Sequence, residues 1–303
     1  MNILWEEFIL GNKMTINKYG FLGKEIKQYM YNLEKQYKEV FDFYIKFNHF
    51  INKSKYNIKI KNSDFQGAMI IQTFNKSLTT FQAIYCLYKH YLCNNAENLC
   101  RVLFEEMVNI GYCTLGINEA KRYYSLQIIN KLKFINTVNQ PENKVFFTEH
   151  YKEMIFKDHS YDETKRELLK SLSILDIKDL FDKNNKPKAI SLEERIDKIG
   201  SRQIKHYYLL FYRIASVGVH SLPELSGKYL KFNQEGLLKE LRWGPGAENC
   251  EISSIFASIH FMNIILKYIH NYFGYPKQKD LVRFWEKTSE LAYKYEYFIE
   301  NLE

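Results

Sequence analysis

Residues 212–225, with the sequence YRIASVGVHSLPEL, carry the side chains in this chain best suited to chemistry. Arg213 and His220 are seven residues apart, so both point from one face of a helix, and Ser216 lies between them on that face. A guanidinium binds anions, and an imidazole exchanges protons near neutral pH. A structural interpretation fits the spacing equally well: His220 interacts with the helix dipole at the helix end, and Arg213 extends to solvent.

A second charged pair lies about 110 residues upstream, in the segment AENLCRVLFEEMVNIGY (residues 96–112). Arg101 and Glu105 are four residues apart, so they can pair along a helix. On the surface such a pair is a modest local stabiliser. If it faces the interior it needs a further partner, because an isolated buried charge is very costly.

The two segments together resemble the HEPN superfamily of helical proteins, whose motif is an arginine and a histidine separated by four to six residues. A group of bacterial HEPN-like proteins joins an R-x-x-x-E helix to a helix end of the form Y-R-x-x-S-x-x-x-H. The matching positions here are Arg101, Glu105, Tyr212, Arg213, Ser216 and His220. The resemblance covers roughly residues 65–275. One position departs from it, because HEPN nucleases commonly carry Asn, Asp or His directly after the arginine, and this chain has Ile214.

The resemblance implies metal-independent cleavage of RNA by a homodimer, with Arg213 and His220 of two protomers meeting as the catalytic residues. RNA carries its own nucleophile, the 2′-OH, so this reaction needs no metal-bound water and no cofactor. A guanidinium stabilises the charge that builds on the phosphoryl oxygens, and a histidine takes the 2′-OH proton or protonates the 5′-leaving oxygen. The supporting residues would be Ser216, Tyr212, Arg101 and Glu105.

Other candidate sites in the sequence are weaker. The chain has no GxxxxGK[ST], GxGxxG, GxSxG or HExxH motif and no paired CxxC, which argues against P-loop hydrolases and common zinc enzymes. Cys86, Cys93 and Cys100 recur every seven residues beside His90, but buried cysteine acting as a small hydrophobic residue is the favoured interpretation. The polar segment 148–160 is interpreted as solvated, and no metal site is expected.

The chain is modestly basic, with a formal net charge of +8, which is compatible with a phosphate-bearing partner. Four lysines without an acidic neighbour lie within residues 52–63: Lys53, Lys55, Lys59 and Lys61. They are candidate contacts to an RNA backbone. A solvated loop or short hairpin of lysines is the alternative, and charge patterning alone favours it.

Composition indicates a helical protein with a real core. Apolar residues make up 46% of the 303 residues, and 13 glycines and 5 prolines leave few turn signals. The N-terminus MNILWEEFIL lacks the basic region of a signal peptide, and the apolar stretch 252–269 is interrupted by polar residues, as in a buried core helix. Five cysteines without a disulfide-like pattern indicate a reducing cytoplasm.

Hydrophobic periodicity predicts the order of the elements. Between residues 24 and 53 apolar residues alternate at spacings of four and three, which is a heptad seam: Ile26, Met30, Leu33, Tyr37, Val40, Tyr44, Phe47 and Ile51. Further helices are predicted over residues 64–92, 96–113, 118–136, 202–220, 248–273 and 277–300. Asn94 or Asn95 and Asn118 are the predicted N-caps. Residues 182–191 are predicted to be a loop.

We therefore expect an all-α, HEPN-like multi-helix bundle, with N-terminal helices over residues 1–63, a helical domain over residues 64–303 and a small β-hairpin or irregular flap at 228–246. The expected function is that of a metal-independent endoribonuclease, a toxin or antiphage-defence effector that binds RNA and pairs with an antitoxin or another defence component. The alternatives are a non-catalytic helical interaction module and a nucleotide-sensing module.

Overall fold

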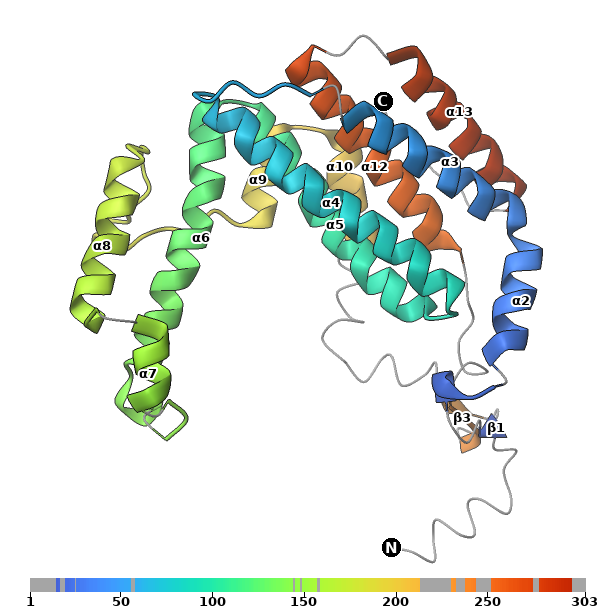
Figure 1. Ribbon diagram of the computed structural model, residues 1–303, viewed down its shortest axis with the longest axis horizontal. Coiled ribbons are helices and arrows are strands. Elements are labelled where there is room, and N and C mark those ends of the chain that lie inside the picture. Colours follow the sequence, from blue (N-terminus) through green and yellow to red (C-terminus); the bar gives the residue numbers. More distant parts are fainter. Residues whose placement is uncertain are drawn as a thin grey trace, which may run out of the picture. The chain divides into compact units, whose positions relative to one another are not determined.

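The computed structural model of the protein describes residues 15–16, 20–24, 26–55, 58–143, 145–147, 149–156, 159–212, 230–232, 238–243, 252–274 and 278–295. Helices form most of the described structure, so the predicted multi-helix bundle is confirmed (Figure 1). The chain divides into two compact units. Unit 1 comprises Met1–Lys59, Thr73–Met107 and Ser201–Glu303, and unit 2 comprises Ile60–Gln72 and Val108–Gly200. This division differs from the one expected at residues 63 and 64.

The predicted heptad seam lies on two consecutive helices of unit 1, α2 (Ile26–Gln36) and α3 (Lys38–Lys55). Tyr37 between them still donates its backbone N–H to the Leu33 carbonyl, so the hydrogen-bond ladder continues across the junction. The second half of the seam is buried, as the spacing predicts: Val40, Tyr44, Phe47 and Ile51 are each no more than 1% exposed. These helices therefore contribute their seam to the core of unit 1.

Helix α4 (Phe65–Lys89) packs against α3 through aromatic rings. The rings of Tyr44 and Phe81 stack with centroids 4.1 Å apart, and Tyr44 Oη donates to the Phe81 carbonyl at 2.7 Å. The same hydroxyl lies 3.2 Å from Ser258 Oγ on α12 (Ser253–Phe273). Because the buried hydroxyl has these partners, the ring can lie in the core without an unsatisfied polar group.

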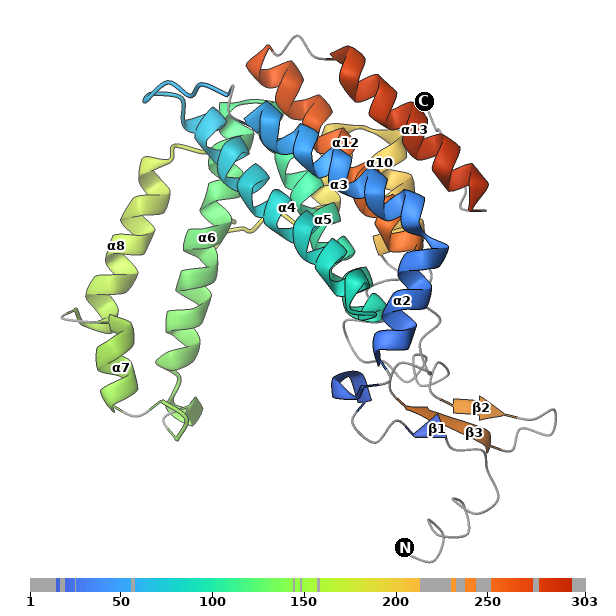
Figure 2. The ribbon, with the colours of Figure 1, turned by 45° about the vertical axis from the view of Figure 1, so that its right-hand side comes forward.

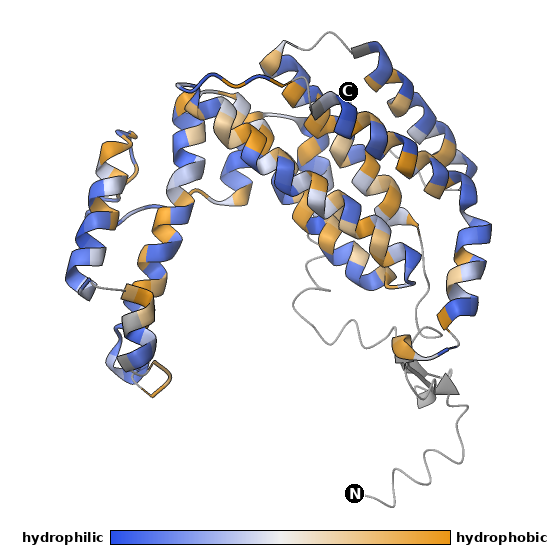
Figure 3. Cartoon of the chain, in the orientation of Figure 1, coloured by the Kyte–Doolittle hydropathy of each residue, from blue (hydrophilic) through white to orange (hydrophobic). Residues whose placement is uncertain are grey.

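Helix α12 is the central helix of unit 1, and its residues from Ser254 to Leu266 are buried on every face. The prediction of a buried core helix is thereby confirmed. Helix α13 (Gln278–Lys294) packs on α12 and alternates hydrophobic and hydrophilic residues, as α3 also does (Figure 3). No helix of the described residues combines the length and hydrophobicity needed to cross a membrane.

A small three-stranded sheet also belongs to unit 1 (Figure 2). Its strands are β1 (Thr15–Ile16), β2 (Leu230–Phe232) and β3 (Leu238–Trp243), in the order β1-β3-β2. β2 pairs with β3 in antiparallel orientation, and β1 joins the other edge of β3 in parallel. The antiparallel pair lies within residues 228–246, where a hairpin or flap is predicted.

Unit 2 is built from α6 (Ile117–Val138), α7 (Glu149–Phe156), α8 (Tyr161–Ile174) and α9 (Leu192–Ile199), with the adjoining ends of α4 and α5. Its core lies mainly on α6 and α8 and includes Ile128, Leu132, Ile135 and Leu172. Both α8 and α9 begin with a complete capping box, Ser160 with Glu163 and Ser191 with Glu194. Each box satisfies backbone N–H groups that the first helical turn leaves free.

Two predicted N-caps are wrong. Helix α5 (Cys93–Thr114) begins before Asn94 and Asn95, which lie in its first turn, and α6 begins after Gly116 without a side-chain cap. Asn118 therefore lies inside α6. Capping preferences locate a helix start to within a turn, and here neighbouring apolar residues extend each helix further. The predicted loop at 182–191 is confirmed, since these residues form no helix and end at the capping serine of α9.

Candidate functional site

The predicted catalytic residues Arg213 and His220, with Ser216 and the departing position Ile214, lie outside the described residues. The described segment that precedes them ends at Tyr212, and the description resumes at residue 230. The structure therefore addresses the supporting residues of the predicted site, and the positions of the catalytic pair stay a prediction.

The helix predicted over residues 202–220 is described up to Tyr212. Ser201 caps the start of α10 (Arg202–Tyr207) by accepting from the Ile204 N–H at 3.3 Å. The chain then widens into a π-helical segment, η3 (Tyr208–Tyr212). Such segments are rare and are frequently found at functional sites. The last described residue of this segment, Tyr212, directly precedes Arg213 in the sequence.

The structure brings together the three described residues that were predicted to support the site. Arg101 Nη2 donates to Tyr212 Oη at 2.8 Å, and Tyr212 Oη donates to Glu105 Oε1 at 2.7 Å. Arg101 and Glu105 lie one turn apart on α5, with 3.6 Å between Nη2 and Oε1. The phenol therefore bridges the two charged groups and is the further partner that a mostly buried Arg101 requires.

Ring contacts hold Tyr212 in this position. The Arg101 guanidinium carbon lies 4.5 Å from the centroid of the Tyr212 ring, in the range of a cation–π interaction. Phe104, on the same helix as Arg101, packs against Tyr212 with centroids 5.4 Å apart. Phe104 also contacts Phe261 of α12, which contacts Phe211. The end of η3 is thus packed between α5 and α12.

The charged groups of this cluster differ in exposure. The Arg101 side chain is 16% exposed, and that of Glu105 is 40% exposed. Arg101 Nε is buried and has no hydrogen-bond partner within the described part of the chain. Burial raises the pKa of Tyr212, the Glu105 carboxylate raises it further, and the Arg101 guanidinium opposes both. Tyr212 is therefore a neutral phenol at physiological pH, able to accept from one partner and donate to the other.

A second polar cluster of unit 1 was missed by the sequence argument. His260 Nε2 is hydrogen-bonded to Tyr207 Oη at 2.6 Å and lies 3.4 Å from Gln203 Nε2. The ring of Trp285 packs on the imidazole, with centroids 4.3 Å apart. Burial lowers the pKa of His260 to about 3. In the sequence, His260 is one of the polar residues that interrupt the apolar stretch of α12. Its spacing from Tyr207 does not predict that the two side chains are hydrogen-bonded.

The candidate RNA-binding lysines surround the end of α3 and the segment after it. Lys53 lies on α3, and Lys59 and Lys61 lie in the non-helical segment before α4; all three are exposed. The Lys55 backbone ends α3, and its side chain lies outside the described residues. The exposure of Lys53, Lys59 and Lys61 is compatible with phosphate contacts and equally with a solvated loop.

The cysteines do not form a metal site in the part of the chain that the structure describes. No group of three or more His, Cys, Asp or Glu side chains there could hold a metal ion. Cys100 is buried and its Sγ donates to the Ser254 carbonyl at 3.4 Å, in agreement with the core interpretation. Cys86 is exposed, and Cys93 is disulfide-bonded. The expectation of cysteines without a disulfide, which was the basis for a reducing compartment, is therefore wrong at Cys93.

Comparison with known proteins gives a family. The model of DUF5677, a family of unknown function, matches residues 67–237, which is more than half of the chain. The chain belongs to DUF5677. The matched residues include Arg101, Glu105, Tyr212 and the predicted catalytic pair, so this DUF5677 chain carries its candidate site within the family region. No curated protein and no solved structure matches the chain.

Proposed function

We propose that this DUF5677 protein is a metal-independent endoribonuclease with a HEPN-like helical domain, and that Arg213 and His220 are its catalytic residues. The observation that carries the proposal is the pair of hydrogen bonds at Tyr212, from Arg101 and to Glu105. These bonds fix the chain one residue before Arg213. The three residues are those that the resemblance assigns to the support of the site.

The chemistry follows from the residue types. The 2′-OH of RNA attacks the adjacent phosphate, and the bond to the 5′-oxygen of the next nucleotide breaks. The proton of the 2′-OH leaves to a base and a proton is added to the 5′-oxygen, roles that an imidazole of near-neutral pKa can fill. The Arg213 guanidinium stabilises the negative charge on the phosphoryl oxygens. The products are a 2′,3′-cyclic phosphate and a 5′-hydroxyl.

The proposal includes a homodimer in which Arg213 of one protomer and His220 of its partner share one cleft. The lysines at 53, 55, 59 and 61 would contact the RNA backbone without sequence preference. The cellular role would be that of a toxin or antiphage-defence effector in the cytoplasm, controlled by an antitoxin or another defence component.

A second candidate function is a non-catalytic helical interaction module. It is favoured by the contacts of the Arg101–Glu105–Tyr212 cluster, since these three side chains pair with one another without a bound molecule. In that case the cluster is a structural brace for the end of η3, and Ile214 reflects the absence of selection for catalysis. We favour the nuclease because the cluster directly precedes Arg213 in the sequence, and the seven-residue spacing predicts that Arg213 and His220 share one helix face.

Cleavage assays with purified protein in EDTA test the proposal. Arg213→Ala and His220→Ala should each lower cleavage of a mixed RNA panel by about 100-fold or more, because each removes a charge or a proton carrier from the transition state. Arg202→Ala and His159→Ala change exposed residues and serve as matched controls that should keep wild-type activity. Circular dichroism melts of all variants separate loss of activity from loss of fold. Wild-type protein that cleaves no RNA of the panel contradicts the proposal.

A further inference from the structure

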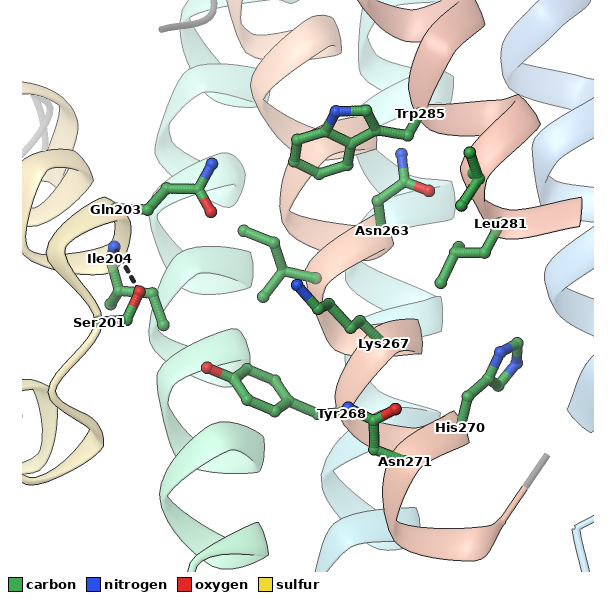
Figure 4. A pocket seen from close by; sticks show the side chains of 12 residues that line it. Ser201, Gln203, Ile204, Asn263, Lys267, Tyr268, His270, Asn271, Leu281 and Trp285 are labelled. Atoms are coloured by element: carbon green, nitrogen blue, oxygen red, sulfur yellow. Dashed lines mark hydrogen bonds between the residues drawn. The ribbon is translucent and has the colours of Figure 1, made fainter. Parts of the chain in front are cut away.

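A cavity of about 580 Å³ lies in unit 1 between α10, α12 and α13 (Figure 4). Its volume is in the range of small-molecule sites in proteins. Its wall is mainly apolar and aromatic, with Ile264 and Tyr268 from α12 and Leu281 and Trp285 from α13. Gln203 of α10 lies across from the α12 side chains. The cavity is separate from the Arg101–Glu105–Tyr212 cluster, and no residue of that cluster lines it.

Asn263 is the unusual residue of the wall. Its side chain is 1% exposed, and neither its amide nitrogen nor its amide oxygen has a hydrogen-bond partner within the described part of the chain. A buried amide without partners is destabilising, so native proteins seldom keep one without a further role. Asn263 lines the cavity, where a bound molecule would supply the hydrogen bonds that the protein does not.

The unpaired amide nitrogen and oxygen of Asn263 determine which hydrogen-bonding groups the bound molecule must carry. The Asn263 amide presents a donor and an acceptor side by side in one plane. A carboxylate provides acceptors alone and a guanidinium donors alone, so each would leave half of the amide unpaired. A lactam or amidine edge of a flat heterocycle offers one acceptor and one donor, and asparagine pairs with heterocycle edges in this bidentate manner.

The rest of the wall suits the same molecule. Trp285 packs on His260, which is three residues before Asn263 on α12, so an indole ring stands close to the amide. Lys267 lies four residues after Asn263 on the same face of α12, and its side chain extends toward α10 in Figure 4. The backbones of the two residues are thus about 6 Å apart along the helix axis, and Lys267 brings to the same wall a positive charge that favours an anionic group.

We infer that this cavity is a binding site for a small planar heterocycle with a lactam edge and an acidic group. The edge pairs with Asn263, the ring lies against Trp285, and the acidic group lies near Lys267. Pyrimidine nucleotides and free pyrimidine carboxylic acids share this chemistry. The inference does not depend on the ribonuclease proposal, because it uses none of the residues of that site.

Calorimetric titration of the full chain with uridine 5′-monophosphate and with orotate tests the site and separates the two sources. At least one of the two acids should bind, the tighter of the two identifies the source, and benzoate, an anion without a lactam edge, should not bind. Asn263→Leu should weaken binding by about tenfold or more, since it removes both hydrogen bonds. Lys267→Gln should weaken binding of the acids but not of neutral uracil, and Lys279→Gln, an exposed lysine of α13 that does not line the cavity, should change neither.

Thermal melts make the test decisive in the unliganded protein. Asn263→Leu should melt at the wild-type temperature or above it, because it removes an unsatisfied buried amide. A clearly lower melting temperature would mean that the protein itself satisfies the amide, which overturns the inference. Equal affinity of wild type and Asn263→Leu, or no binding of either acid at about 5 mM, overturns it as well.

Discussion

Arg101 and Tyr212 lie 111 residues apart in the chain and make two contacts with each other. A guanidinium nitrogen donates to the phenol oxygen at 2.8 Å, and the guanidinium carbon lies 4.5 Å from the ring centroid. The hydrogen bond and the ring contact together restrain both the tip and the face of Tyr212. The relationship ties α5 to the end of η3, directly before the predicted catalytic arginine.

Tyr212→Phe separates these two contacts. It keeps the ring and removes the hydroxyl that accepts from Arg101 and donates to Glu105. We expect the unfolding free energy to fall by about 1–3 kcal/mol, because two charged partners lose their part-buried hydrogen bonds to the phenol. If Tyr212 positions Arg213, kcat for RNA cleavage should fall by about 10- to 100-fold with little change in KM.

The matched control is Tyr293→Phe, which alters a tyrosine that is 76% exposed and should change neither stability nor kcat. A Tyr212→Phe protein that loses stability and keeps full kcat would show that the cluster stabilises the fold without positioning Arg213. Denaturant titration and single-turnover cleavage measure the two effects.

Mixing two inactive variants tests the shared site. Arg213→Ala and His220→Ala proteins each lack one half of the proposed pair. If the halves come from different protomers, half of the dimers formed after exchange contain one intact site of two, and the mixture should regain roughly one quarter of wild-type activity. A mixture that stays as inactive as its components, with exchange verified by mass spectrometry, would place both residues of each pair in one protomer.

Glu106 should oppose folding at neutral pH. It is 2% exposed; its Oε1 accepts from Thr80 and lies 3.3 Å from Lys76 Nζ, while Oε2 has no partner within the described part of the chain. Burial raises the pKa of Glu106 more than Lys76 lowers it. A raised folded-state pKa stabilises the fold fully below the unfolded value of about 4.5, and that stabilisation is lost as pH rises through the folded value.

Glu106→Gln removes this ionisation. We expect the variant to be more stable than wild type at pH 7, the difference to shrink as pH falls from the raised folded-state pKa toward about 4.5, and to be absent below that pH. Denaturant melts across this pH range measure it, with the exposed Glu142→Gln as control. A variant that is less stable than wild type at pH 7 would show that the ion pair with Lys76 outweighs the cost of burial.

His260 has the opposite pH dependence. Burial lowers its pKa to about 3, so the folded protein holds it neutral beside Tyr207. The unfolded chain takes up the proton below about pH 6.5, and stability from this residue is lost as pH falls from about 6.5 to about 3, by up to about 5 kcal/mol. His260→Gln should remove this part of the acid sensitivity, and the exposed His150→Gln should not. Imidazole NMR signals of His260 that titrate near pH 6.5 in the folded protein would contradict this account.

The sequence predicted the elements of the fold better than their ends. Heptad spacing identified Val40, Tyr44, Phe47 and Ile51 as core residues, because a helix period determines which face is buried. It did not predict that Asn118 lies inside α6, since capping signals recur within a turn of one another. Nor did it predict the pairing of β1 with β3, which joins residues more than 220 positions apart.

The residues of the candidate sites were likewise predictable from the sequence only in part. Arg101 and Glu105 were recognisable from their i,i+4 spacing, and the need for a third partner follows from the cost of a buried charge. The resemblance assigned Tyr212 to the support of the site, but its hydrogen bonds with Arg101 and Glu105 were not predicted. Asn263 and His260 gave no signal, because a single polar residue in an apolar helix has the same spacing whether it is satisfied, functional or merely tolerated.

The most direct measurement is cleavage in EDTA of an RNA and of the same oligonucleotide with 2′-deoxy sugars, followed by mass spectrometry of the ends. The account predicts that the RNA is cut to 2′,3′-cyclic phosphate and 5′-hydroxyl ends and that the deoxy strand stays intact, because the nucleophile belongs to the RNA. Cleavage of the deoxy strand, or cleavage of RNA that requires added metal, would contradict it.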